Sequence, residues 1–73
     1  MPTQEMRALW HPTRARILEL LKAESATQSH LAESAGAPFA EVVYHCRALC
    51  RSGCIQYAAS SGPDSDDPVF ETA

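Results

Sequence analysis

Hydrophobic residues recur every three or four positions in several stretches of this 73-residue chain, as they do on one face of an α-helix. The clearest stretch predicts a helix over residues 12–23, beginning at Pro12, which a first helical turn tolerates. Its apolar stripe consists of Ile17, Leu18, Leu20 and Leu21. A shorter helix over about residues 3–10 is expected to precede it, because His11 stands before a proline and therefore avoids the α region.

Two more helices are predicted on either side of a short turn. Residues 27–35 form the first, with Thr27 as N-cap and Gly36 as its end, and residues 38–52 form the second, starting at Pro38. Two helices joined by a short turn containing glycine are typical of a helix-turn-helix.

The helix at 38–52 has two sides of different character. Its predicted core side carries Phe39, Val42, Cys46 and Leu49, at offsets of zero, three, seven and ten. The other side presents Glu41, Val43, Tyr44, Arg47, Cys50 and Arg51. A helix about 10 Å wide fits into the roughly 12 Å major groove of DNA, so this side is the candidate contact surface.

The remainder of the chain predicts a β-hairpin over about residues 54–72. Residues 55–57 alternate apolar and polar positions, residues 60–68 have turn and loop composition, and residues 69–72 return as a partner strand. The predicted fold class is therefore mainly α with a C-terminal β-hairpin. At this length we expect one small domain, residues 1–73, without a large active-site cleft.

Composition and charge narrow the functional classes. With 45% hydrophobic and 21% charged residues the chain reads as a soluble globular protein, and no apolar run approaches the roughly 20 residues of a membrane span. A cytoplasmic protein is expected. Residues 1–57 hold six basic and five acidic side chains, a net charge of +1, whereas residues 58–73 hold four acidic and no basic ones.

No pattern in the sequence predicts catalysis or a bound cofactor, so we expect no enzyme. Credible nucleophile–base arrangements, phosphate-binding glycine loops and paired carboxylates are missing from the sequence. The three cysteines are expected to be reduced. Cys46 and Cys54 should pack as small hydrophobes, and Cys50 should be exposed.

Several motifs together resemble the ArsR-type winged helix-turn-helix regulators. The segment His11-Pro12-Thr13-Arg14-Ala15-Arg16-Ile17-Leu18-Glu19-Leu20-Leu21 is similar to the family's second-helix motif. Leu31-Ala32-Glu33, Tyr44-His45-Cys46-Arg47-Ala48-Leu49 and Gly53-Cys54-Ile55 follow the family's "LAE … YHxRxL … GLI" run in order and spacing. The resemblance covers about residues 4–57, and Phe70 is a weaker match to the family's second wing strand.

The resemblance implies a prokaryotic transcription regulator that binds double-stranded DNA with the helix at 38–52 in the major groove. Its expected DNA contacts are Thr27, Gln28, Ser29, Glu41, Val43, Tyr44, Arg47 and Arg51. His45 is expected to pack beside the core with a hydrogen bond. A weak homodimer is expected through Met6, Leu9 and Trp10.

The chain departs from the family pattern in ways that keep two alternatives open. Val43 replaces a small hydroxyl residue, and Asp64, Asp66 and Asp67 stand where arginines are common in the wing. The acidic wing favours a protein-interaction module on the same scaffold, with a protein partner bound through the wing. The spacing of Cys46, Cys50 and Cys54 allows a thiol- or metal-responsive repressor instead.

Overall fold

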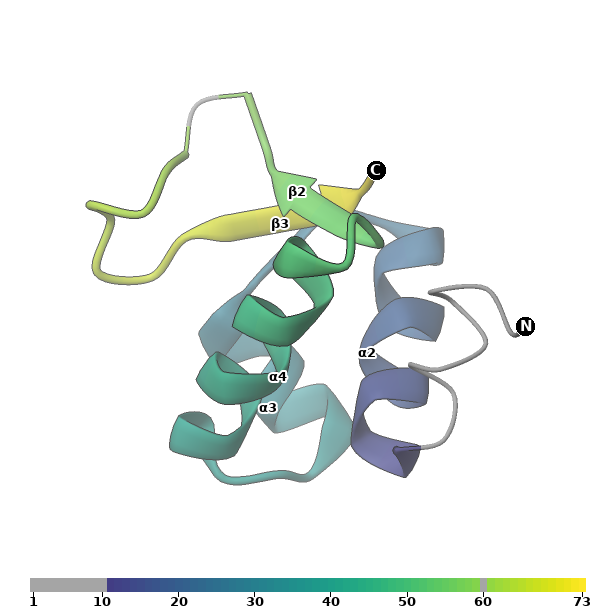
Figure 1. The fold of residues 1–73 in the computed structure, drawn as a ribbon. Helices are drawn as coiled ribbons and strands as arrows, with labels where there is room; N and C mark the ends of the chain where they lie inside the picture. Colours follow the sequence, from purple (N-terminus) through teal and green to yellow (C-terminus); the bar gives the residue numbers. More distant parts are fainter. Residues whose placement is uncertain (1–10, 60) are drawn as a thin grey trace.

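Three helices and a small antiparallel sheet make up the described part of the protein (Figure 1). The computed structural model describes residues 11–59 and 61–73, and its elements keep the labels of Figure 1. They are α2 (Pro12–Ala23), β1 (Ala26–Thr27), α3 (Gln28–Ala35), α4 (Phe39–Arg51), β2 (Ile55–Tyr57) and β3 (Val69–Thr72). The predicted helix at 3–10 and the predicted dimer residues Met6, Leu9 and Trp10 lie outside the described residues. None of the described helices is long and apolar enough to cross a membrane.

Local sequence signals account for the helix ends. Pro12 stands in the first turn of α2. Thr27 is the N-cap of α3, as predicted, and its Oγ1 accepts a hydrogen bond from the His30 N–H at 3.1 Å. Gly36 ends α3 at φ 66°, a left-handed conformation that glycine adopts without steric cost. The positions of Thr27 and Gly36 thus set the length of α3.

The predicted core side of α4 is confirmed at Val42, Cys46 and Leu49, which are at most 1% exposed. It is wrong at Phe39, which is 46% exposed. Phe39 is the first residue of α4, about one turn before Val42, so it lies at the helix end beyond the buried residues. Its ring lines a surface hollow beside the wing and does not enter the core.

The sheet has one strand more than the predicted hairpin. Its order is β1-β3-β2, so β3 is central, and Ala26 pairs with Phe70 while Thr27 pairs with Val69. The residues between the predicted helices at 12–23 and 27–35 therefore include part of a strand. A two-residue strand is too short to show alternation, which is why the sequence pattern does not reveal it.

Helices and sheet share one hydrophobic core. Its buried members come from every described element: Ile17, Leu18, Leu21, Ala26, Leu31, Val42, Cys46, Leu49, Ile55 and Phe70. The sheet lies across one end of the helices, and the loop between β2 and β3 extends away from them (Figure 1). We call residues 58–68 the wing loop. The predicted fold class, mainly α with a C-terminal hairpin, is confirmed.

Candidate nucleic-acid interface

The side of α4 that faces away from the core presents the predicted contact residues in unequal ways. Tyr44 is 63% exposed, and Arg47 and Arg51 are also exposed. Successive residues turn the helix by about 100°, so these three lie within about 60° of one another, opposite the buried residues. They form one continuous outer strip along α4.

The two arginines of this strip are available to bind an external anion. Among the described residues, no carboxylate lies within 4.0 Å of either guanidinium, whereas Arg16 on α2 pairs with Glu19 at 3.4 Å. Arg47 and Arg51 are four positions apart, which puts them one turn apart on the same side of α4. The pair is therefore a cationic strip that no described acidic side chain neutralises.

His45 connects this helix to the start of α2. The Arg14 Nε donates a hydrogen bond to the His45 Nδ1 at 2.9 Å, and the His45 Nε2 lies 3.5 Å from the Glu41 Oε1. Arg14 also lies over the Tyr44 ring, with its Cζ 5.7 Å from the ring centroid. His45 is buried and hydrogen-bonded, as expected. Glu41 is placed on the flank of α4 that faces α2, away from the arginine strip.

The other flank of α4 borders the wing loop. A surface hollow of about 200 Å³ separates them and is lined by residues of α3, α4 and the wing. Val43 and Arg47 contribute from α4, Gln28 from α3, and Asp66 from the wing loop. Gln28 is only 6% exposed, although it lines this hollow. The fold thus brings Gln28, Val43 and Arg47 to one place.

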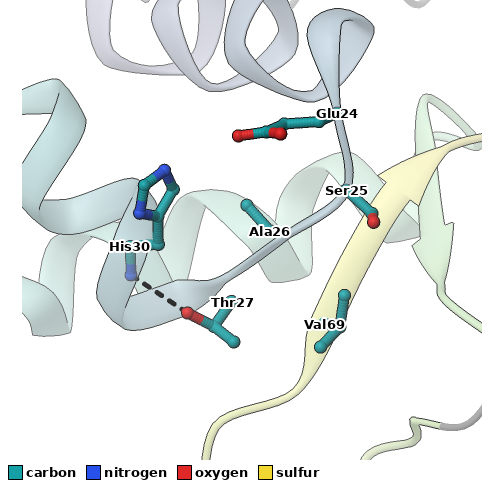
Figure 2. A pocket seen from close by; sticks show the side chains of 6 residues that line it. All are labelled: Glu24, Ser25, Ala26, Thr27, His30 and Val69. Carbon is teal, nitrogen blue, oxygen red and sulfur yellow. Dashed lines mark hydrogen bonds between the residues drawn. The ribbon is translucent and has the colours of Figure 1, made fainter.

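The N-terminus of α3 completes this surface, and a wing carboxylate occupies it. The Ser29 N–H donates a hydrogen bond to the Asp67 Oδ1 at 3.1 Å, and the next N–H, of His30, is taken by Thr27. Figure 2 shows the Thr27 side chain bonded to the His30 N–H, with Val69 of β3 on the strand beside it. Sequence reasoning missed the Asp67 contact, because it depends on the register between β1 and β3.

A second hollow, of about 320 Å³, lies on another part of the surface (Figure 2). It is lined by Glu24, Ser25, Ala26, Thr27, His30 and Val69. It borders the candidate interface at Thr27 and His30, but no residue of α4 lines it, and its one acidic residue, Glu24, opposes an anion.

The three cysteines do not form a shared site. Cys46 is completely buried, and burial, followed by the neighbouring Cys50, raises the pKa of its thiol from 9.0 to about 12. Cys50 is half-buried against the core, not exposed as expected, and burial raises its pKa too. Cys54 is also half-buried, and its sulfur accepts a hydrogen bond from the Ser52 hydroxyl at 3.3 Å. Within residues 11–59 and 61–73, no three His, Cys, Asp or Glu side chains are grouped to hold a metal ion.

Solved structures of other proteins resemble this arrangement closely. No protein-family model matches the sequence, and no curated protein matches it. The Mycobacterium tuberculosis protein Rv0081 is 25% identical, with a TM-score of 0.75 over 92% of this chain and 64% of that one. An ArsR family transcriptional regulator is also 25% identical, with a TM-score of 0.75 over 92% of this chain and 69% of its own.

A third structure is the homodimeric winged helix-turn-helix DNA-binding domain of Mb0332 from Mycobacterium bovis, described as a possible ArsR-family regulator. It is 19% identical, with a TM-score of 0.75 over 92% of this chain. This chain spans 64% of the M. tuberculosis protein and 58% of the M. bovis domain. The chain therefore has the winged helix-turn-helix fold and resembles the ArsR-type regulators, as its sequence motifs predicted.

Proposed function

We propose that this chain is a transcription regulator that binds double-stranded DNA with α4 in the major groove. The observation that carries the proposal is the exposed strip of Arg47 and Arg51, which no described carboxylate neutralises. This strip lies on the second helix of a helix-turn-helix, beside the α3 N-terminus. The resemblance to ArsR-type regulators supports the same function.

Each contact residue is assigned a role that follows from its chemistry. Arg47 and Arg51 reach guanine edges or phosphates, because a guanidinium donates two parallel hydrogen bonds to either. Val43 offers only apolar contact, such as with a thymine methyl group. The Tyr44 hydroxyl donates a hydrogen bond to the DNA backbone. The first turn of α3, with Thr27, Gln28 and Ser29, holds a phosphate through backbone N–H groups.

Binding should be modest and should weaken steeply with salt. The described part of the interface offers few cations, and the acidic wing repels phosphate. Each phosphate that a cation neutralises adds about −0.9 to the slope of log affinity against log salt concentration. Glu41, which contacts His45, places a negative charge at the edge of the interface.

Fluorescence anisotropy with random and operator-like duplexes at low salt tests this proposal. Arg47→Ala and Arg51→Ala should each weaken binding by about fivefold or more. The matched control is Arg16→Ala on α2. It removes an exposed arginine that is paired with Glu19 of the same helix. If wild-type protein binds no duplex, or if the three variants bind equally well, the proposal is wrong.

We also propose that the regulator acts as a weak homodimer through Met6, Leu9 and Trp10. The homodimeric M. bovis domain supports this idea. Light scattering after size exclusion should give about twice the mass of a 7.9 kDa chain at high concentration, and Leu9→Asp should reduce it to one chain. A dimer would predict a palindromic site with half-sites about one helical turn apart.

A second candidate function is protein binding through the wing, favoured by its charge. The wing loop carries Asp64, Asp66 and Asp67 without a basic residue, so a basic protein surface would complement it. Partner capture from lysate that survives nuclease treatment, and that Asp64→Asn with Asp66→Asn abolishes, would support this function. Capture that disappears with nuclease would favour DNA binding.

A further inference from the structure

The Asp67 carboxylate is hydrogen-bonded to the first turn of α3, the same turn to which the proposed function assigns a DNA phosphate. We propose that Asp67 competes with the DNA backbone for this position, so that the wing restrains binding from within the molecule. The inference rests on the proposed function and concerns how it is regulated. It requires Asp67 to leave the Ser29 N–H whenever a phosphate arrives.

Strand register places Asp67 there. Thr27 of β1 pairs with Val69 of β3, and the two strands are antiparallel. The chain enters α3 directly after Thr27, and Asp67 lies two residues before Val69, so this pairing brings Asp67 next to the first turn of α3. The Ser29 N–H and the Asp67 Oδ1 are 3.1 Å apart, which is a normal hydrogen-bond length.

The strand that follows Asp67 is held firmly in the fold. Pro68 is buried, and the Val69 N–H donates a hydrogen bond to the Ser61 hydroxyl at 2.8 Å. Phe70, which follows, is 1% exposed and stacks on Tyr57 with ring centroids 5.0 Å apart. The backbone of the wing is thus anchored by the core, and the carboxylate returns to the helix end after each displacement.

The two anions exclude one another at this position. One N–H can donate fully to only one oxygen, and the N-terminus of a helix attracts carboxylate and phosphate for the same electrostatic reason. A carboxylate left beside an incoming phosphate also repels it. Asp67 is partly exposed, so a rotation of its side chain toward water is the displacement that the proposal requires.

Asp67→Ala and Asp64→Ala form a matched pair for the test. Both remove one negative charge from the wing loop, but Asp64 is exposed and makes no hydrogen bond or ion pair with the described residues. Long-range repulsion from either acid is screened over about 8 Å at physiological salt, whereas competition at one N–H is not. In anisotropy titrations at that salt, Asp67→Ala should bind duplex DNA about fivefold to tenfold more tightly than Asp64→Ala. Equal affinities of the two variants would overturn the proposal.

A measurement without DNA separates this inference from the proposed function. Inorganic phosphate should shift the Ser29 amide signal in ¹H–¹⁵N spectra of Asp67→Ala, and should leave it unchanged in the wild type and in Asp64→Ala. Asp67→Asn, which keeps an oxygen for the helix end but removes the charge, provides a second folded variant and should respond weakly to phosphate.

The outcomes are distinguishable. If Asp67→Ala responds to phosphate but no variant binds a duplex, the competition for anions is correct and the DNA-binding function is wrong. If duplex binding occurs and Asp67→Ala gains no affinity over Asp64→Ala, Asp67 only caps α3 and the inference is wrong.

Discussion

His45 lies between two charged side chains and connects two helices. Because Arg14 donates to its Nδ1, that nitrogen must carry a lone pair, and the proton of a neutral ring is therefore on Nε2, facing Glu41. The sequence predicted a buried, hydrogen-bonded histidine, but neither partner. Arg14 lies 31 positions away in the chain, so only the packing of α2 against α4 brings the two together.

The sulfur of Cys46 makes the stability of the protein sensitive to alkaline pH. Burial raises the pKa of this thiol from 9.0 to about 12, so between these values the unfolded chain loses the proton and the folded chain keeps it. The unfolded state then binds fewer protons, and the free energy of unfolding must fall as pH rises. Urea unfolding at about pH 8 and about pH 10.5 should show this fall.

Cys46→Ala is the control for this alkaline effect. The variant loses some stability at every pH because it leaves a small cavity, but its further loss between the two pH values should be smaller than in the wild type. Tyrosine and lysine titrations are common to both proteins and cancel in the comparison. An equal alkaline loss in both proteins would show that Cys46 is not its source.

At the scale of elements, α3 and α4 end in the same way. Gly36 and Gly53 have φ values of 66° and 80°. After α3, the Ala37 N–H donates to the Ala32 carbonyl at 3.1 Å, and after α4 the Cys54 N–H donates to the Leu49 carbonyl at 3.0 Å. Both bonds span five positions and form Schellman motifs, which turn the chain sharply at a glycine. The first motif sets the angle of the helix-turn-helix, and the second leads α4 into β2.

Substitution of these glycines should cost stability for a conformational reason only. A Cβ added at Gly36 or Gly53 would meet nothing within 4 Å, so the cost comes from the left-handed backbone and should be about 1–2 kcal/mol for Gly36→Ala. Gly62→Ala is a matched control, because Gly62 has equally open space and lacks a positive φ. Urea unfolding should show a change of less than about 0.5 kcal/mol there. A similar loss at Gly62 would contradict the conformational explanation.

Elements with a strong periodic or capping signal were predictable, and elements set by tertiary contact were not. The ends of α2, α3 and α4 follow Pro12, Thr27, Gly36 and Pro38, whose preferences are local. Strand β1 exists only because β3 lies beside it, and its two residues have no pattern of their own. The Asp67 contact follows from that pairing and was equally hidden. The arginine strip of α4 was predictable, because its helical spacing is visible in the sequence.

For the whole molecule, the wing is part of the core and not an appendage. Phe70 of β3 is 1% exposed, pairs with Ala26 of β1, and stacks on Tyr57 of β2. The helices contribute Ile17, Leu31, Leu49 and other residues to the same cluster. A 73-residue domain has a free energy of unfolding of only about 4–11 kcal/mol, so a single core ring is a large part of its stability.

Phe70→Ala should therefore weaken the helices together with the sheet. Truncation of a buried phenylalanine costs about 3–5 kcal/mol, which is comparable with the lower end of that stability range. Phe39→Ala, the same change at a ring that is 46% exposed, should cost far less. Far-ultraviolet circular dichroism during urea unfolding measures the helical signal directly, and Phe70→Leu preserves enough volume to keep a folded state for comparison. If Phe70→Ala retained full helical content with wild-type stability, the sheet would be an independent unit. Because the wing strand packs in the same core as the helix-turn-helix, we expect one cooperative transition instead.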